Sequence, residues 1–343
     1  MPAPFDPDGP ARGSGLFGLP SAPEEAAVHV LPVPFDATTS YRRGTAGGPA
    51  AVLAASRQVD LEDLWTGRPY EAGIALLEGA PRIGELQRAA SDAAERARAL
   101  PEGSPERAEA TRAVDACGAE LNALVRGAVE RALAHAKLPC VLGGDHSAPF
   151  GALEACSAAH AGLGVLHFDA HADLRRAYEG FEWSHASILY NVVERLDVAR
   201  VLQVGVRDLC GEELERIERS DGRIRSVFDR EWASARFAGA DLRALVRGKL
   251  DLLPESVYVS FDVDGLDPTL CPSTGTPVPG GLDWHEAMLW LEELAASGRR
   301  VVGLDLCEVC PGPGGDPRGE GWDAIVGARL LYRLIGFALR TRG

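Results

Sequence analysis

Short apolar runs alternate with amphipathic stretches along most of the chain. The runs with the length of strands are residues 28–33, 71–77, 139–144, 163–169, 200–206, 256–264 and 300–308. Helical periodicity lies between them, at residues 149–160, 186–196, 212–219 and 284–297. Alternation of this kind predicts a parallel sheet covered by helices on both faces.

Two segments depart from this alternation. Residues 1–27 are rich in proline and glycine and have no clear periodicity, which predicts an extended N-terminal arm. Residues 84–137 are dominated by alanine, glutamate and arginine, with apolar residues at helical spacing. We expect two helices there, with Ser104 as the N-cap of the second and Pro105 in its first turn. The predicted organisation is therefore an arm followed by a single domain, 28–343, with a helical insertion at about 84–137.

Bulk composition narrows the class of protein. The chain has 343 residues, 46% hydrophobic and 25% charged, with a formal net charge of −15. The acidic balance argues against nucleic acid and anionic membrane surfaces as partners and is compatible with a cationic substrate. Seven scattered cysteines indicate reduced thiols, and the N-terminus has no secretory pattern, so we expect a cytoplasmic protein.

Acidic residues and histidines follow three of the apolar runs. The three clusters are Asp145 and His146; Asp169, His171 and Asp173; and Asp262, Asp264 and Asp267. Ligands of parallel α/β sheets bind at the carboxyl ends of the strands, so the clusters should meet at one edge. Because strand side chains alternate, Asp169, His171 and Asp173 project to one side if the backbone stays extended.

Six of these residues form a candidate metal centre, namely His146, Asp169, His171, Asp173, Asp262 and Asp264. Without metal ions, four converging carboxylates would repel one another. Mixed oxygen and nitrogen ligands suit manganese, nickel or iron, and two neighbouring ions lower the pKa of a shared water enough to make a hydroxide nucleophile. We expect Asp145 and Asp267 to be turn or supporting residues. His167 is expected to pack in the core.

The blocks that carry these residues resemble the signatures of a known family. "GGDHS", "FDAHADLR", "SFDVDGLDP", "TGTPVPGGL" and "GLDLCEV" look like the blocks of the ureohydrolases, which include arginases, agmatinases and formimidoylglutamases. The resemblance runs over about residues 28–340 and is strongest to the agmatinase branch. It implies a three-layer α/β/α sandwich, arginase/deacetylase-like, with a mainly parallel sheet and the metal site at the carboxyl ends of its strands.

The resemblance also implies a cofactor and a division of the ligands. Two Mn²⁺ ions are the family default, with Ni²⁺ as the alternative. By this pattern one ion is held by His146, Asp169, Asp173 and Asp262. The other ion is held by Asp169, His171, Asp262 and Asp264, so that Asp169 and Asp262 bridge the pair.

The family reaction is hydrolysis of a guanidinium group to urea and an amine. His185 matches the family histidine that carries a proton to the leaving nitrogen, a role that suits a side chain with a pKa near neutrality. Glu308 matches the glutamate that binds the guanidinium, since paired carboxylate oxygens fit paired N–H groups. The implied catalytic residues are thus His185, Asp173 and Glu308.

Residues 174–184 bear on the substrate. This loop lacks the Asn- and Ser-rich pattern of arginases and looks like the agmatinase version, so agmatine, giving putrescine, is the expected substrate. Glu179 or Glu182 would meet its amine tail. Arg175 or Arg176 would instead hold the carboxylate of a guanidino acid, as in a guanidinobutyrase.

A third substrate follows from three aromatic residues. If Trp322 lies at the mouth of the site with Phe181 and Trp183 opposite, the pocket is short and suits free guanidine, as in a guanidine hydrolase. Otherwise Trp322 packs in the core.

Two other classes of protein stay open at this point. A deacetylase-like amidohydrolase with a single zinc shares the fold but uses fewer carboxylates, and a metal-binding protein without catalysis needs no proton shuttle. The expected partner is a small cationic guanidino compound. By family analogy alone, the chain is expected to form a homo-oligomer, a trimer or a hexamer.

Overall fold

A computed structural model describes residues 5–312 and 318–342. Within these residues, eight strands form one sheet in the order β2-β1-β3-β8-β7-β4-β5-β6, and every neighbouring pair is parallel. The strands are β1 Val28–Val33, β2 Ile74–Leu76, β3 Leu138–Gly143, β4 Leu163–Phe168, β5 Val198–Val204, β6 Ile224–Val227, β7 Ser256–Asp262 and β8 Arg300–Cys307. The predicted parallel sheet is confirmed.

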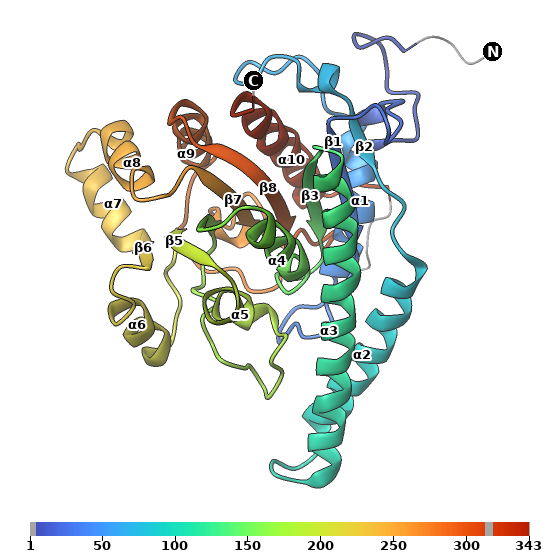
Figure 1. The fold of residues 1–343 in the computed structure, drawn as a ribbon, viewed down its shortest axis with the longest axis vertical. Helices are drawn as coiled ribbons and strands as arrows, with labels where there is room; N and C mark the ends of the chain where they lie inside the picture. Colours follow the sequence, from blue (N-terminus) through green and yellow to red (C-terminus); the bar gives the residue numbers. More distant parts are fainter. Residues whose placement is uncertain (1–4, 313–317, 343) are drawn as a thin grey trace.

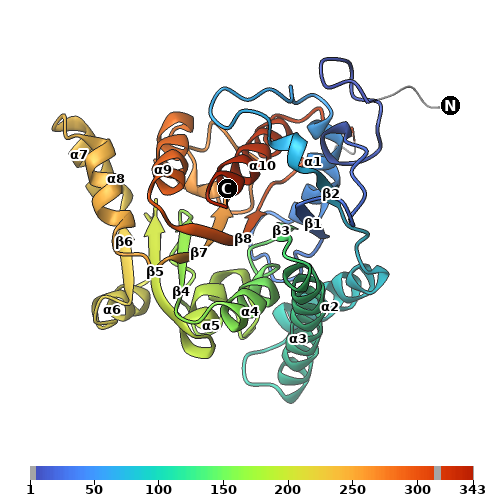
Figure 2. The ribbon, with the colours of Figure 1, turned by 45° about the horizontal axis from the view of Figure 1, so that its top comes forward.

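Helices cover both faces of the sheet (Figure 2). They are α1 Gly48–Ser56, α2 Pro81–Ala99, α3 Pro105–Ala134, α4 Phe150–Ala159, α5 Ile188–Arg195, α6 Gly211–Glu218, α7 Asp229–Phe237, α8 Leu242–Leu250, α9 Trp284–Ala296 and α10 Trp322–Arg340. Short 3-10 turns lie at Leu16–Gly18, Thr45–Gly47, Pro69–Ala72, His185–Ser187 and Val263–Gly265. Two helical layers around one sheet make the predicted three-layer sandwich.

The alternating side chains of the strands feed two separate apolar cores. On β3, Cys140 and Leu142 belong to the core that α1, α9 and α10 cover, whereas Val141 belongs to the core under α3, α4 and α5. Buried strands of this kind read as continuous apolar runs, because both faces are covered. This is why the central strands could be recognised in the sequence.

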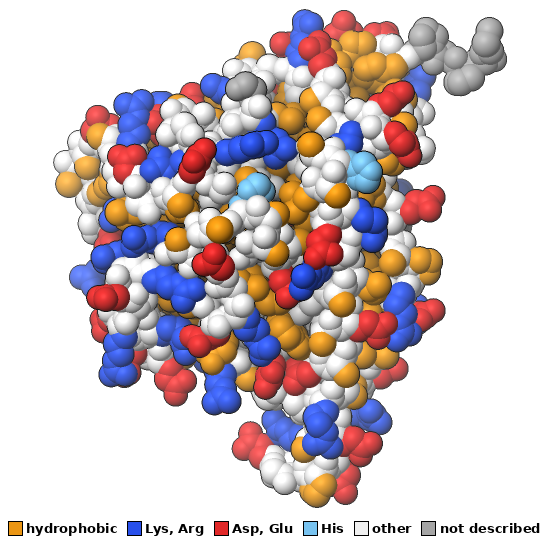
Figure 3. All heavy atoms as spheres, viewed as in Figure 1, with side chains coloured by type: hydrophobic (Ala, Val, Ile, Leu, Met, Phe, Trp, Pro, Cys, Tyr) orange, Lys and Arg blue, Asp and Glu red, His pale blue; other side chains and the backbone are white. Residues whose placement is uncertain are grey.

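The segment predicted to be helical is a long hairpin of α2 and α3 (Figure 1). Ser104 caps α3, accepting a hydrogen bond from the Arg107 amide at 3.2 Å, as predicted. The far end of the hairpin projects from the body of the molecule and carries charged side chains of both signs (Figure 3). Residues 87–98 of α2 contact the loop that follows β1.

Several elements differ from the predictions. The strand expected at 71–77 shrinks to Ile74–Leu76, because the preceding residues form a 3-10 turn that starts at Pro69. The elements β6, α7, α8 and α10 were not predicted. Most of residues 323–338 in α10 are buried, and a helix buried nearly all round has no clear polar face to mark it.

The predicted N-terminal arm is described from residue 5 onward, and its residues 1–4 lie outside the described part, as do 313–317 and 343 of the predicted domain. In residues 5–27 the structure has one 3-10 turn, whose Phe17 is buried edge-on against Tyr332, with ring centroids 4.7 Å apart. Within the described residues, the structure contains no helix with the length and apolarity needed to cross a bilayer.

Candidate metal centre and active site

The predicted metal ligands meet at the carboxyl edge of four adjacent strands, β3, β8, β7 and β4. His146 lies three residues after β3, and Asp169 follows β4 directly. Asp262 is the last residue of β7, and Glu308 follows β8. The strand order changes direction in this part of the sheet, and ligands of open α/β sheets bind at such a point.

The ligand loops do not continue the strands. β4 ends at Phe168, and Asp173 has a left-handed φ of 53°, so the backbone from Asp169 to Asp173 is not extended. Strand alternation therefore does not explain why these three side chains lie together. A Cβ at Gly265 would lie 2.7 Å from the Asp169 amide nitrogen, which explains the glycine after Asp264. The loops fold over one another and bring the clusters together from different directions.

The first ligand group surrounds His146. Its Nδ1 lies 2.9 Å from Asp169 Oδ2 and 3.2 Å from Asp173 Oδ2. Asp262 Oδ2 is 3.4 Å from the same nitrogen. All four side chains are buried. These are the four residues that the resemblance assigns to one metal ion.

The second ligand group surrounds His171. Its Nδ1 lies 3.0 Å from Asp264 Oδ2 and 3.4 Å from Asp169 Oδ1. Asp169 therefore presents one oxygen to each histidine. Two ligands that bind one ion at about 2.1 Å are about 3 Å apart, so the spacing within each group suits the binding of one divalent ion.

The charges of the cluster are unbalanced without cations. Burial opposes the charged imidazoles, but the carboxylates of Asp169 and Asp173 outweigh it and raise the pKa of His146. Burial and the charge of Asp169 raise the pKa of Asp173 to about 6, and burial together with Asp264 raises the pKa of Asp262. Divalent cations would stabilise the ionised form of these buried acids, which could then serve as metal ligands.

His167 differs from its predicted role. It is buried, as expected of a core residue, and its ring stacks on His146 with centroids 5.1 Å apart. However, its Nε2 lies 3.0 Å from Asp169 Oδ2, on the metal side of the strand end. The Gln203 amide faces the other ring nitrogen at 3.3 Å. His167 is therefore a neighbour of the bridging carboxylate and not only a packing residue.

Ser260 and Asp305 support His146 and were not predicted. The Nε2 of His146 lies 2.9 Å from Ser260 Oγ, which donates to Asp305 Oδ1 at 3.2 Å. This arrangement places the imidazole proton on Nε2 and leaves Nδ1 free to bind a cation. Ser260 precedes Asp262 by two positions on β7, so the period of a strand already placed both on one face.

Arg207 holds the loop that carries Asp264. Its guanidinium donates to the carbonyl of Asp264 at 2.6 Å and to those of Leu266 and Val278 at 3.1 and 3.0 Å. No sequence pattern marked this residue, because it acts through backbone carbonyls that any residue provides. Asp145 and Asp267 do cap turns, accepting from the backbone amides of Ser147 and Thr269.

His185 opens a 3-10 turn at the rim of the metal centre. Its backbone amide donates to Thr38 Oγ1 at 3.2 Å, and its Nδ1 lies 3.3 Å from the same oxygen. The Thr38 hydroxyl in turn donates to Asp145 Oδ2 at 3.2 Å. Desolvation, followed by the charge of His171, lowers the pKa of His185 to about 3. This value differs from the near-neutral pKa expected of a proton carrier, and it makes the resting ring a neutral acceptor.

Glu308 presents a free carboxylate oxygen to the site. Its Oε1 accepts from the His146 amide at 3.0 Å, while its Oε2 is buried and has no hydrogen-bond partner among the described residues. A Cβ at Gly275 would lie 3.2 Å from Oε2, so that glycine leaves space beside it. Burial, then the charges of Asp145 and Asp264, raises the pKa of Glu308. A cationic partner would relieve this cost.

Three charged residues of loop 174–184 contact protein groups, and the fourth, Arg176, is exposed. Glu179 Oε2 pairs with the Arg98 guanidinium of α2 at 2.6 Å, and a substrate amine would have to replace that partner. Glu182 lies 3.5 Å from Arg195. Arg175 lies over the Tyr178 ring at 5.1 Å. Whether Glu179 binds substrate stays a prediction.

The aromatic residues do not close a pocket in the expected way. Phe181 is buried among alanines of the α2–α3 hairpin, and Trp183 packs on Phe150 with centroids 4.8 Å apart. Trp322 begins α10, is 53% exposed and donates from Nε1 to the Thr269 carbonyl at 3.0 Å. The alternative in which Trp322 packs in the core is therefore wrong. Its role toward substrate stays a prediction.

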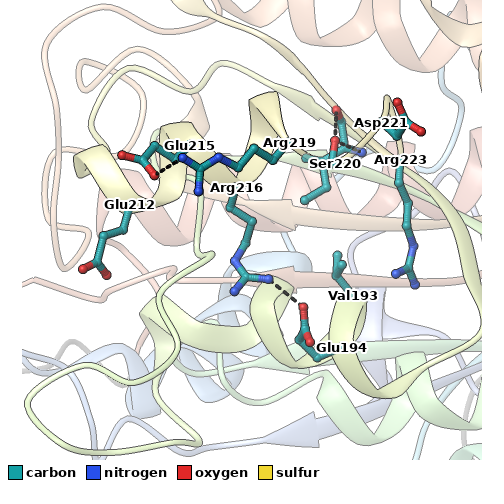
Figure 4. A pocket seen from close by; sticks show the side chains of 10 residues that line it. Val193, Glu194, Glu212, Glu215, Arg216, Arg219, Ser220, Asp221 and Arg223 are labelled. Carbon is teal, nitrogen blue, oxygen red and sulfur yellow. Dashed lines mark hydrogen bonds and ion pairs between the residues drawn. The ribbon is translucent and has the colours of Figure 1, made fainter.

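A groove of about 470 Å³ lies elsewhere, between α5, α6 and the turn before β6 (Figure 4). Because residues 220–224 lead into β6, the groove opens at the amino edge of the sheet, away from the metal ligands. Its charges pair with one another, Arg216 with Glu194 at 2.6 Å and Arg219 with Glu215 at 3.2 Å. None of the predicted site residues lines it.

Two ligand groups that share one aspartate, at the carboxyl edge of a parallel α/β sheet, form a candidate binuclear metal centre of the kind that metal-dependent hydrolases use. Comparison with known proteins then gives the family. Residues 26–336 match the model of the arginase family. The chain belongs to this family and is an enzyme, a hydrolase of guanidino C–N bonds.

Individual relatives cover nearly the whole chain. The N(1)-aminopropylagmatine ureohydrolase of Thermus thermophilus is 32% identical over 323 residues, 94% of each chain. The agmatinase of Pyrococcus horikoshii is also 32% identical and covers 92% of this chain and 94% of its own. Among solved structures, the proclavaminate amidino hydrolase of Streptomyces clavuligerus has a TM-score of 0.73, with 24% identity and coverage of 97% and 99%.

Proposed function

We propose that the protein hydrolyses an agmatine-type compound, in which a guanidinium group and an amine share one alkyl chain, to urea and the free amine. Agmatine, giving putrescine, is the first candidate. The observation that carries the proposal is the buried Oε2 of Glu308, which has no hydrogen-bond partner among the described residues and lies where a Cβ at Gly275 would crowd it. A guanidinium supplies the charge and the donors that this oxygen lacks.

The names of the relatives support a substrate with an amine tail. Of the three similar proteins described above, two act, by their names, on agmatine or its N(1)-aminopropyl derivative, and the third is named for proclavaminate. The net charge of −15 favours cationic substrates in general. The aminopropyl derivative is therefore the second candidate substrate.

The ligand groups fit two divalent cations, with Mn²⁺ as the first candidate and Ni²⁺ as the alternative. His146, Asp169, Asp173 and Asp262 would hold one ion, and Asp169, His171, Asp262 and Asp264 would hold the other. When bound, two such ions supply a hydroxide nucleophile at neutral pH.

Side chains of this protein would do the rest. Glu308 orients the guanidinium and balances its charge, because two parallel hydrogen bonds fix a planar cation. His185 takes up a proton and passes it to the departing nitrogen, since the amine leaves only when protonated. Thr38 holds the ring of His185, accepting from its Nδ1–H while donating to Asp145, which leaves Nε2 for the proton transfer.

The other substrates have less support. For a guanidino acid, Arg175 is engaged, since it lies over Tyr178 and 3.7 Å from Glu213, so the carboxylate would fall to Arg176, which is exposed. Free guanidine needs a shortened pocket, but Phe181 and Trp183 pack against the hairpin and its neighbours. A single-zinc amidohydrolase does not use two carboxylate-rich ligand groups.

Urea release from matched substrates tests the proposal. Protein loaded with Mn²⁺ or Ni²⁺ is assayed with agmatine, N(1)-aminopropylagmatine, 4-guanidinobutyrate, arginine and guanidine. We expect kcat/KM to be highest for one of the two amine-bearing substrates. If guanidinobutyrate or guanidine is turned over fastest, the proposed agmatine-type substrate is wrong. If none of the five compounds releases urea, the proposed hydrolysis of a guanidinium group is wrong.

Two further expectations are proposals of the same kind. We infer a cytoplasmic location. The seven cysteines support it, because all of them are free thiols. We also infer assembly into a trimer or hexamer, and light scattering coupled to gel filtration measures this mass directly; a monomer would contradict it.

A further inference from the structure

One face of α2 carries a row of polar side chains that contact the loop after β1. Gln87 exchanges two hydrogen bonds with Asp36, at 2.5 Å to its carboxylate and 2.9 Å from its amide. One turn on, Ser91 accepts from the Arg43 guanidinium at 2.7 Å. Glu95, a further turn on, pairs with the same arginine at 2.6 Å. Helical spacing of four places these groups in line along the loop.

Arg98 ends this row and contacts two loops at once. Its Nη2 donates to the carbonyls of Thr38 and Thr39 at 3.0 and 3.2 Å, while its Nε pairs with Glu179 at 2.6 Å. Its guanidinium also lies over the Phe181 ring, 5.5 Å from the centroid. Loop 36–44 and loop 174–184 are therefore joined through one side chain. A fork of donors is what allows one residue to do this.

Both loops that Arg98 joins touch His185. Thr38 contacts the backbone amide and the Nδ1 of His185, as described above. In the other loop, Tyr178 and Phe181 close a tight turn with reciprocal backbone hydrogen bonds of 3.1 and 2.9 Å. The Tyr178 ring stands edge-on to the imidazole of His185, with centroids 6.0 Å apart.

The turn itself requires support. Glu179 has a φ of 54°, in the left-handed region that residues other than glycine and asparagine rarely adopt, and Gly180 follows with a φ of 97°. The ion pair to Arg98 holds the side chain of this strained residue. The second helix of the hairpin holds the next residues, since Asp115 accepts from the Glu182 amide at 2.9 Å.

We propose that Arg98 is a positioning residue for the reaction, which joins loop 36–44 to loop 174–184 and thereby fixes the imidazole of His185. The proposal rests on the proposed function in so far as His185 moves a proton there. It gives the α2–α3 hairpin a task in catalysis. It also gives Glu179 a role as the partner of Arg98 and not of the substrate.

The central experiment compares Arg98→Ala with Arg96→Ala. Arg96 lies on the same helix, is exposed and serves as the matched control. With agmatine, we expect kcat to fall about 10- to 100-fold in Arg98→Ala, with KM changed less than about threefold, because a displaced proton carrier affects the chemical step more than binding. Arg98→Lys should recover part of the loss, since lysine keeps the charge but not the fork. Arg96→Ala should match wild type.

A double variant tests whether the effect passes through His185. If it does, adding Arg98→Ala to His185→Asn lowers kcat less than about twofold further. Full additivity would overturn the proposal, as would an Arg98→Ala enzyme with wild-type kcat. A rise in KM alone would also overturn it, because it would assign Arg98 and Glu179 to substrate binding.

Hydrogen exchange gives a readout that does not depend on activity. We expect amides of residues 36–44 and 174–185 to exchange at least about tenfold faster in Arg98→Ala than in Arg96→Ala, with the sheet unchanged. Equal exchange in both variants would contradict the joining of the loops. If wild type releases no urea from any guanidino substrate, the proposed function fails, and this exchange experiment still decides the role of Arg98.

Discussion

The metal centre and the two loops beside it are built differently. These loops, residues 36–44 and 174–184, are called the loop wall below. In the metal centre, each ligand lies within five residues of the carboxyl end of a central strand. In the loop wall, the contacts join residues far apart in the chain, such as Arg98 with Glu179 and Thr38 with His185, separated by 81 and 147 positions. A sheet edge fixes the first region, whereas side-chain pairs fix the second. Loss of one ligand should therefore abolish activity, whereas loss of one side-chain pair in the loop wall should lower activity only partly.

The largest effect is expected at the shared carboxylate. Asp169→Asn removes one anionic oxygen from each ligand group, so we expect both metal binding and catalysis to fail, with kcat/KM down by at least about 10³-fold, or roughly 4 kcal/mol. Metal content by mass spectrometry and urea release measure this. Asp267→Asn, which alters only a turn at the same rim, is the control. Full metal content and activity in Asp169→Asn would show that Asp169 is not a ligand.

Glu308→Gln tests the guanidinium contact. Glutamine keeps the acceptor for the His146 amide but turns a neutral N–H group or oxygen toward the substrate, so a charge-assisted pair is lost. We expect kcat/KM for agmatine to fall about 10²-fold, or roughly 3 kcal/mol, with metal content unchanged. Glu182→Gln on the outer loop is the control and should stay within about twofold. The account of the substrate is wrong if both variants behave alike.

Ser260→Ala tests the support of the first ligand group. The hydroxyl that orients His146 is lost while the ligand itself stays. We expect the affinity for the metal ion to weaken about 10- to 100-fold, which is the usual cost of losing such a partner. Metal titration of the chelator-treated protein measures it, with Ser234→Ala on α7 as control. An unchanged affinity would mean that packing alone orients His146.

The smallest effect is expected at Glu179, in the loop wall. Glu179→Gln breaks a partly exposed ion pair, so we expect a fall in kcat of about threefold, or roughly 0.6 kcal/mol, with KM for agmatine unchanged. Parallel assays with agmatine and guanidine separate two roles. A tenfold rise of KM for agmatine but not for guanidine would instead return Glu179 to the amine tail, as the sequence suggested.

The contrast between the two regions also explains what could be predicted. The ligands were predictable because polar residues end apolar runs, and parallel strands bring such ends to one edge. Asp305 carried a usable signal that was missed: it is an acid within a buried strand, which needs a polar neighbour. His167 could not be placed from the sequence, because a histidine in an apolar run gives no direction toward Asp169. Arg98 had no signal, since its partners are set only by tertiary packing.

Crystals grown with Mn²⁺ and measured at the manganese absorption edge would show directly whether the centre binds two ions. We expect two anomalous peaks. One should lie between His146, Asp169 and Asp173, and the other between His171, Asp169 and Asp264, with Asp262 beside both. A single peak, or two peaks away from Asp169, would contradict the binuclear centre on which the proposed hydrolysis depends.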